Sequence, residues 1–143
     1  MAKRKTSLLI AAGLISLFLG SYADGKAEEK KSQWVHYGAT PEGQFYYEKG
    51  SVQKVGGKIV RVWDQLTFKN NKISPSGKEA NKGPGIQISL HEIDCENNKR
   101  KLIKYILYNR EGKISENYIN QNPKMRPIPP NTIYETLEKQ VCR

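Results

Sequence analysis

The placement of its two cysteines constrains this chain of 143 residues more than any other feature of the sequence. Cys95 ends an alternating apolar and polar stretch, and Cys142 is the second-last residue. One thiol at each place favours neither a metal site nor a nucleophilic centre. A bond between them would close the whole C-terminal third. The compartment in which the protein works therefore decides how it is held together.

The first 23 residues have the three parts of a secretory signal peptide. Residues 3–5 are basic, residues 8–19 are apolar, and Ser21 and Ala23 offer small side chains at the positions that a signal peptidase recognises. An uncleaved membrane anchor is the alternative, but the apolar run is short of the ~20 residues that span a bilayer. We expect cleavage after Ala23, and hence an extracytoplasmic, periplasmic or secreted protein.

The rest of the chain divides into a short leader and one domain. Residues 24–32 are charged and lack apolar periodicity, which predicts a flexible leader, within which Ala27 offers a second cleavage position. Residues 33–143 are long enough for a single domain with its own core. Because export places the two thiols in an oxidising compartment, we expect a Cys95–Cys142 disulfide. The chain-entropy model gives about 4 kcal/mol for such a loop.

The net charge of the chain is strongly positive, which narrows the classes of partner that it can bind. Removal of residues 1–23 lowers the formal net charge from +10 to +7. Export excludes nucleic acid as a partner and leaves anionic lipid headgroups, acidic polysaccharides and acidic protein surfaces. Charge that serves only solubility is the competing interpretation.

Short aromatic and β-branched segments predict an antiparallel sheet. Two strands flank the turn at 39–43, Gly56-Gly57 predicts a hairpin, and two further turns at 96–99 and 111–112 continue the meander. In the long arm after Gly57, one face is expected to be core, with the residues Val60, Val62, Leu66 and Phe68. Residues 70–85 have little to bury and predict a long mobile loop.

The C-terminal segment predicts a single helix. The four prolines of residues 120–130 exclude an interior strand and favour an extended segment along the sheet. Thr132 and Glu135 then fit a capping box, and an apolar stripe follows at the residues Ile133, Leu137 and Val141, with Tyr134 on its flank. The predicted fold class is α+β: an antiparallel sheet of about six strands with one C-terminal helix, joined by a strand-to-helix disulfide.

Several stretches together resemble the surface-adhesin protein E family. They are Trp34 after an export signal, "FYYEKGSV", "GGKIVRVWDQLTF", "EIDCENNKRKLI" and the terminal "PIPPNTIYETLEKQVC". The resemblance covers nearly all of residues 33–143 and implies the same sheet, helix and disulfide. It also implies adhesion, since the member that named the family attaches to host matrix glycoproteins as a lipoprotein. No cysteine follows the apolar run here, so this chain is expected not to be a lipoprotein.

A basic cluster at a hairpin tip is the candidate binding patch. Its residues are Lys99, Arg100, Lys101 and Lys104. The alternative is a solvated turn that only discourages aggregation. The acidic residues Glu92, Asp94 and Glu96 are expected to form cross-strand ion pairs with this cluster rather than a cation site.

No catalytic constellation is visible in the sequence. His91 and Cys95 lie some ~13 Å apart along one strand, too far for a nucleophile and its base. His36 and His91 are therefore expected to be surface or edge-strand residues. The sequence predicts a binding module that contacts a matrix protein or an anionic polysaccharide. No catalytic residues, metal or cofactor are expected. The alternative is a periplasmic accessory protein that binds another envelope component; the oligomeric state is left open.

Overall fold

The structure is a computed structural model, and it describes residues 32–73 and 79–143. The predicted signal peptide and nearly all of the predicted leader lie outside the described residues. The elements in chain order are β1 (Trp34–Thr40), β2 (Gly43–Glu48), the 3-10 turn η1 (Lys49–Ser51), β3 (Gln53–Gly56), β4 (Ile59–Phe68), β5 (Lys72–Ile73), β6 (Glu79–Asn81), β7 (Gly85–Asp94), β8 (Lys99–Asn109), β9 (Ile114–Ile119), β10 (Arg126–Pro127) and the helix α1 (Ile133–Val141).

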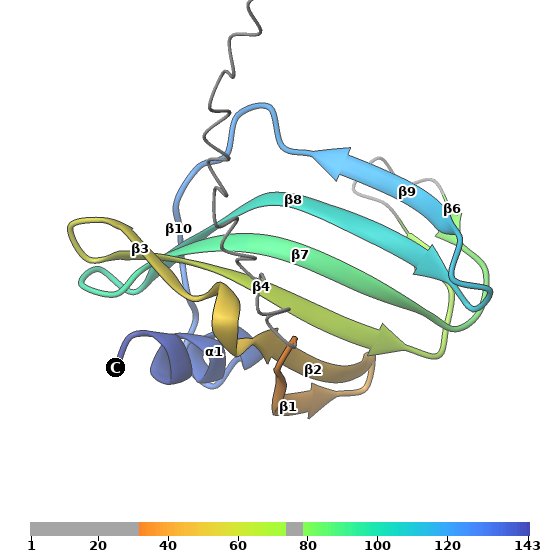
Figure 1. Cartoon of the computed structure of the whole chain (residues 1–143), viewed down its shortest axis with the longest axis horizontal. Helices are drawn as coiled ribbons and strands as arrows, with labels where there is room; N and C mark the ends of the chain where they lie inside the picture. The colour runs from red at the N-terminus through yellow and green to blue at the C-terminus, as the bar shows by residue number, and fades with distance from the viewer. Residues whose placement is uncertain (1–31, 74–78) are drawn as a thin grey trace, which may run out of the picture.

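One antiparallel sheet forms the body of the protein (Figure 1). Its central path runs β1-β2-β4-β7-β8-β10, while β3 pairs with the start of β4 and β9 pairs with the later part of β8. Every pair in this sheet is antiparallel, and most of the consecutive strands are joined by turns too short for a crossover helix. The predicted fold class is confirmed: the path has six strands, and β3 and β9 extend its two edges.

Strict alternation along β4 separates the sheet into two faces. Even-numbered side chains from Val60 to Phe68 are buried, and odd-numbered ones from Ile59 to Thr67 are partly exposed. This period of two is the pattern of a strand that has one face covered. The predicted core residues of this arm are confirmed, but Asp64 shares their face and is also buried. We call the covered side the core face and the other side the open face.

The helix α1 covers one end of the core face. Thr132 Oγ1 accepts a hydrogen bond from the backbone N–H of Glu135 at 3.4 Å, which confirms the predicted N-cap. Glu135 Oε2 reaches back to the N–H of Asn131 at 2.9 Å. Leu137 is fully buried against the sheet. Strand β1 approaches the helix closely at Gly38, where a Cβ atom would overlap the Ile133 side chain.

The disulfide fixes the other end of this helix. Cys142 is the C-cap residue of α1, and Cys95 follows β7 directly. The two residues are bonded, with their Cα atoms 5.6 Å apart, a normal separation for a disulfide. The predicted bridge is therefore confirmed, and it joins the C-terminus of the helix to the end of the central strand β7.

A polar cluster lies buried between the sheet and the helix. Tyr37 donates a hydrogen bond to Asp64 Oδ2 at 2.9 Å, and His91 Nε2 lies 3.3 Å from Asp64 Oδ1. The His91 ring is 5.6 Å from the ring of Tyr134, and the Arg100 guanidinium stacks 3.4 Å from the centre of that same ring. Burial, and then the Asp64 carboxylate, raise the pKa of Tyr37, so its hydroxyl remains a donor.

Two sequence expectations are wrong. His91 is not a surface or edge residue: it lies in β7, between β4 and β8, with 2% of its surface exposed. Residues 70–85 are not simply a loop, because β5 pairs with β6 and Ala80 packs against the core. The small hairpin of β5 and β6 covers the end of the core face that α1 leaves open. Residues 74–78 lie outside the described residues.

Removal of the disulfide should destabilise the domain strongly. In the double variant Cys95→Ser/Cys142→Ser, the unfolded chain regains the freedom of the closed loop, and we expect the free energy of unfolding to fall by about 4 kcal/mol. Urea unfolding of the oxidised protein and of the variant measures the difference. The reduced wild-type protein is the control and should match the variant. Equal stability of all three forms would contradict the prediction.

The hydroxyl of Tyr37 should stabilise the protein through Asp64. Tyr37→Phe leaves a buried carboxylate with one donor fewer, so we expect a loss of roughly 1–3 kcal/mol. Tyr46→Phe is the matched control, since Tyr46 lies in β2 on the open face and its hydroxyl has no hydrogen bond among the described residues. Chemical denaturation compares the two variants. Equal midpoints for both would show that the buried hydrogen bond contributes little.

Two glutamates of α1 should respond to pH with opposite signs. Burial, and then the charge of Glu135, raise the pKa of Glu138, so its ionised form destabilises the fold. Glu138→Gln should raise Tm at neutral pH and lose that advantage below about pH 4, where the carboxyl is protonated in both states.

Glu135 supplies the matched control for that measurement. Hydrogen bonds from Lys139, and then from the backbone of Asn131, lower the pKa of Glu135. Its contribution is present above its unfolded pKa and is lost as the pH falls through its folded pKa. Glu135→Gln should therefore lower Tm at neutral pH and have little effect in acid. Thermal scans at pH 3 and pH 7 measure both variants. Changes in Tm of the same sign at pH 7, or changes of undiminished size at pH 3, would contradict this explanation.

Candidate binding surface

The open face carries side chains in rows that the strand register fixes. The first row contains Ile59, Asp94 and Lys99, and the second contains Arg61, Glu92 and Lys101. A third row contains Trp63, Leu90, Lys104 and Ile119. Beyond it the face is apolar, with the residues Ile86, Ile88, Ile106, Tyr108 and Ile114. The open face is therefore charged at the β7–β8 hairpin and apolar towards the other end.

Three of the four predicted patch residues lie on this face, and a β-bulge is the reason. Residues 101 and 104 would face opposite sides of a regular strand. The register of β8 shifts at Ile103, so Leu90 pairs with Lys104 while His91 pairs with Leu102. Lys101 and Lys104 consequently both point away from the helix. Lys99 joins them beside Asp94.

Arg100, the fourth predicted patch residue, lies on the core face. It pairs in register with the buried Ile93 and stacks on Tyr134 of the helix. The guanidinium is partly buried there and faces away from the three lysines. Arg100 therefore stabilises the contact between helix and sheet, and the patch on the open face consists of Lys99, Lys101 and Lys104.

A single carboxylate organises the charged end of the open face. Lys101 Nζ lies 2.7 Å from Glu92 Oε2, and Arg61 Nε donates to Glu92 Oε1 at 3.0 Å. Burial alone would raise the pKa of Glu92, but the hydrogen bonds from Lys101 and Arg61 outweigh it and hold the pKa below its usual value. Two cations on one anion leave this row with a net positive charge.

The predicted acidic ladder is confirmed at Glu92 only. Asp94 stands beside Lys99 in the register, but its carboxylate accepts hydrogen bonds from the turn, including Asn97 Nδ2 at 2.9 Å. That side-chain hydrogen bond lowers the pKa of Asp94. Glu96 lies in the turn itself and is exposed. These two acids shape the hairpin turn rather than neutralise the patch.

The third row joins charge to aromatic surface. Lys104 Nζ lies 5.0 Å from the centre of the Trp63 ring, a cation–π contact that extends the lysine along the face. Further along the face, an apolar groove of about 470 Å³ has its floor at Ile86, Ile88 and Tyr108 and is bordered by Arg110. The basic end of the open face therefore passes into an apolar region at the Trp63 row.

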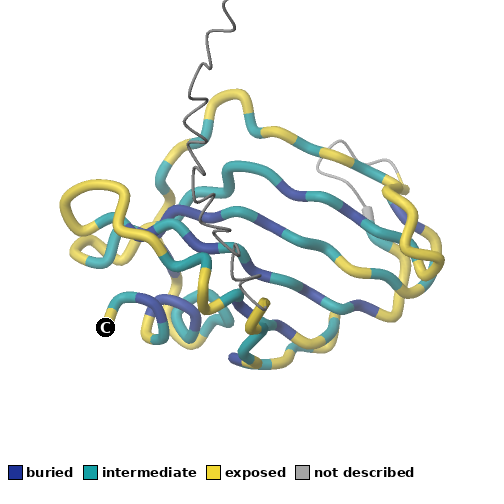
Figure 2. Tube along the Cα trace, viewed as in Figure 1, coloured by how far each residue is buried: buried dark blue, intermediate teal, exposed yellow. Residues whose placement is uncertain are grey.

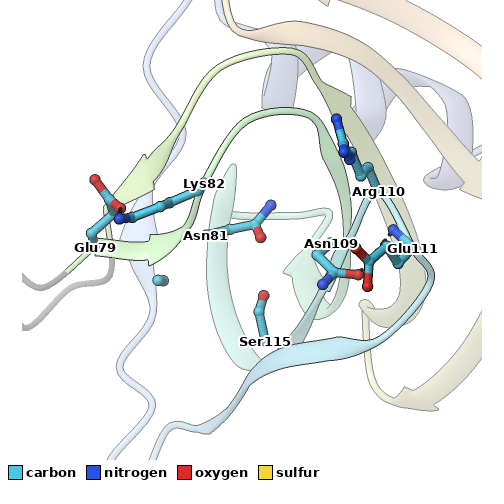
Figure 3. Close-up of a pocket in the computed structure, with 8 residues that line it drawn as sticks. Glu79, Asn81, Lys82, Asn109, Arg110, Glu111 and Ser115 are labelled. Carbon is cyan, nitrogen blue, oxygen red and sulfur yellow. Dashed lines mark hydrogen bonds and ion pairs between the residues drawn. The ribbon is translucent and has the colours of Figure 1, made fainter.

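A second concavity lies between β6 and the β8–β9 turn, and it is polar (Figure 3). Its volume is about 340 Å³. Glu79 and Lys82 stand on one side, Arg110 and Glu111 on the other, and Asn81 and Ser115 lie between them. Its charges balance, unlike those at the β7–β8 hairpin.

The titratable residues of the described part of the chain do not form an accessible catalytic site. The His91–Asp64 pair has the groups of a proton relay, but both residues are almost fully buried beneath α1, out of reach of a substrate. Within residues 32–73 and 79–143, no three His, Cys, Asp or Glu side chains converge to hold a metal ion. In the same part of the chain, no helix has the length and apolar character to span a membrane.

The sequence analysis did not predict that Asp64 is buried, and it did not predict which side chains share the open face. Asp64 has the same parity as Val62 and Leu66, so the alternation alone places it in the core. His91 follows from the same parity in β7, where it pairs with Val62. The pairing of Arg61 with Glu92 needs the exact register, which the sequence does not contain.

Comparisons with known proteins agree with this architecture. The family model described as surface-adhesin protein E matches residues 34–143. The crystal structure of protein E from non-typeable Haemophilus influenzae is similar, with a TM-score of 0.55 and 13% sequence identity over 80% of this chain and 78% of that one. At that identity the likeness concerns the fold. No curated protein matches the chain.

The match to the family model extends from the first strand of the sheet to the last residue and includes both cysteines. It covers every element that forms the two faces. The chain therefore belongs to the surface-adhesin protein E family.

Proposed function

We propose that the chain is an exported adhesion module that binds an anionic extracellular polymer or matrix protein through the β7–β8 hairpin. Membership of a family of surface adhesins supports a binding role. The identity of the partner and the position of the binding site are what we propose here. The observation that carries it is the group of Lys99, Lys101 and Lys104 on the face opposite the helix, with Arg61 beside them. Glu92 lies between Arg61 and Lys101 and neutralises one of these two cations.

Charge and surface shape support an extended anionic partner. The lysines lie along neighbouring rows rather than at one point, so a chain of repeated anionic groups can contact several of them. The Trp63 ring under Lys104 adds an apolar platform beside the charges. Because Lys99 is exposed and Lys101 and Lys104 are partly exposed, the attraction is electrostatic and should weaken as salt screens it.

Replacement of the three lysines should weaken binding to a sulfated polysaccharide. We expect Lys99→Gln/Lys101→Gln/Lys104→Gln to elute from immobilised heparin at a clearly lower salt concentration than the wild-type protein, since three cations are lost from one surface. Glutamine is preferred to glutamate because a reversed charge at residue 101 would repel Glu92. Arg100 is left unchanged because it packs on Tyr134.

A variant with the same net charge provides the control. Lys69→Gln/Lys82→Gln/Lys113→Gln removes three exposed lysines near the opposite end of the sheet, at the ends of β4 and β6 and in the β8–β9 turn (Figure 1). It should elute close to the wild-type protein. Equal losses in the two variants would mean that only net charge matters, and would contradict a binding site at the hairpin.

A further inference from the structure

The strand β9 is the least protected edge of the sheet. It pairs with β8 on one side, and no described strand pairs with its other side. Its sequence, Ile-Ser-Glu-Asn-Tyr-Ile, has no lysine, arginine or proline, the residues by which sheet edges usually discourage pairing. Ile114 and Ile119, at its two ends, are 60% and 56% exposed. Figure 2 shows much of this strand as exposed.

The other edges of the sheet are protected. Strand β1 packs against α1 where Gly38 meets Ile133. Strand β3 carries Lys54 and ends in the Gly56-Gly57 turn, and β10 has two residues, one of which is Pro127. In β9, the β-bulge near Ser115 and the inward-pointing Glu116 lie in the first half of the strand, whereas residues 117–119 carry no such device and are available for an additional strand.

The backbone groups that would receive an additional strand can be identified. The N–H of Asn120 donates to the carbonyl of Ile103 at 2.9 Å, and antiparallel ladder bonds alternate from residue to residue. Tyr118 therefore points its N–H and C=O towards β8, whereas Asn117 and Ile119 point theirs outwards. Their side chains lie on the open face, in register with Ile106 and Lys104.

Charges at both flanks of β9 indicate what kind of strand fits. Arg110 and Lys113 precede it, Lys124 and Arg126 follow it, and all four are exposed. Glu116, within β9, shares its face with Tyr118 and points towards the core face. A second copy of β9, paired in either direction, would bring cations against cations. A strand with acidic ends meets opposite charges instead.

We propose that β9 binds an extended segment of a partner protein by β-strand addition, and that this segment has acidic residues flanking alternating apolar side chains. Main-chain hydrogen bonds to Asn117 and Ile119 provide the attachment, and the apolar side chains of the segment continue the surface of Ile114, Ile119 and Ile106. This inference goes beyond the proposed function, because it concerns a second edge of the domain and backbone contacts rather than the lysines of the β7–β8 hairpin.

Amide exchange of the disulfide-bonded exported protein tests the proposal. The probe is a short synthetic peptide of alternating valine and threonine with an aspartate at each end. At a saturating concentration of this peptide, the amide protons of Asn117 and Ile119 should exchange roughly tenfold more slowly or better, as new hydrogen bonds protect them. The amide of Tyr118, already bonded to β8, should change little. No protection of Asn117 and Ile119 would overturn the proposal.

Variants at one position separate backbone from side-chain effects. Asn117→Pro removes the outward N–H and should abolish the protection of Ile119, whereas Asn117→Ala keeps the N–H and should retain it. If Asn117→Pro disturbs the sheet, a peptide methylated at alternate amide nitrogens tests the same bonds with the protein unchanged, and it should not bind. Equal binding of the methylated peptide would overturn the proposal.

Three further outcomes are decisive. A peptide with lysine ends should bind clearly more weakly, and equal binding would refute the acidic flanks. Protection without peptide that grows with protein concentration would identify a second copy as the occupant and overturn a heterologous partner. Finally, the Asn117→Pro variant should elute from heparin at the same salt concentration as the wild-type protein. The triple glutamine variant at residues 99, 101 and 104 should bind the peptide as the wild-type protein does. Failure of either proposal is thus distinguishable from failure of the other.

Discussion

The disulfide between Cys95 and Cys142 determines which face of the sheet is covered. It joins the last residues of the chain to the residue after β7, and so holds the short helix α1 over the central strands. A helix of nine residues has little stability of its own, and it depends on this packing. Because α1 and the β5–β6 hairpin occupy the core face, the opposite face remains exposed. The covalent bond thereby holds the helix away from the face that carries the proposed binding site.

The two faces use charged groups in different ways. On the core face, the buried Asp64 accepts a hydrogen bond from Tyr37 of β1, and the buried His91 ring lies between Asp64 and the Tyr134 ring of the helix. On the open face, Glu92 is held between Arg61 and Lys101, Lys99 is exposed, and Lys104 is partly exposed over the Trp63 ring. Arg100 and Lys101 are adjacent in sequence, yet one supports the fold and the other faces solvent. Their different roles follow from the alternation of a strand.

Two modes of recognition are compatible on this domain because they use different atoms. The lysines of the β7–β8 hairpin offer side-chain charge that any polyanion can meet, with low sequence specificity. The edge of β9 offers main-chain donors and acceptors, which select an extended backbone of suitable side-chain pattern. An adhesin that combines both can gain affinity by occupying two sites at once, if one partner spans them. The distance from the hairpin to β9 across the open face then limits the size of such a partner.

Much of the fold could be predicted from local patterns. The strand with alternating burial at residues 59–68, the hairpin at the glycines 56 and 57, and the helix start at Thr132 each have a direct local cause, and each prediction is confirmed. The predicted Cys95–Cys142 disulfide is also confirmed. The hairpin at 72–81 was missed because its strands are too short and polar to show periodicity. The proposed signal peptide depends on sequence alone, since residues 1–31 lie outside the described part of the chain.

The sequence by itself determined the basic net charge, and it predicted the pairing of the two cysteines and the sheet with its terminal helix. Only the tertiary structure decided which basic residues act together. The bulge at Ile103 places Lys104 on the same face as Lys101. Arg100 lies on the other face, where it stacks on Tyr134 of the helix. Likewise, the burial of His91 and the free edge of β9 depend on strand order. Register, bulges and strand order arise from contacts between distant segments, which no local pattern of residues contains.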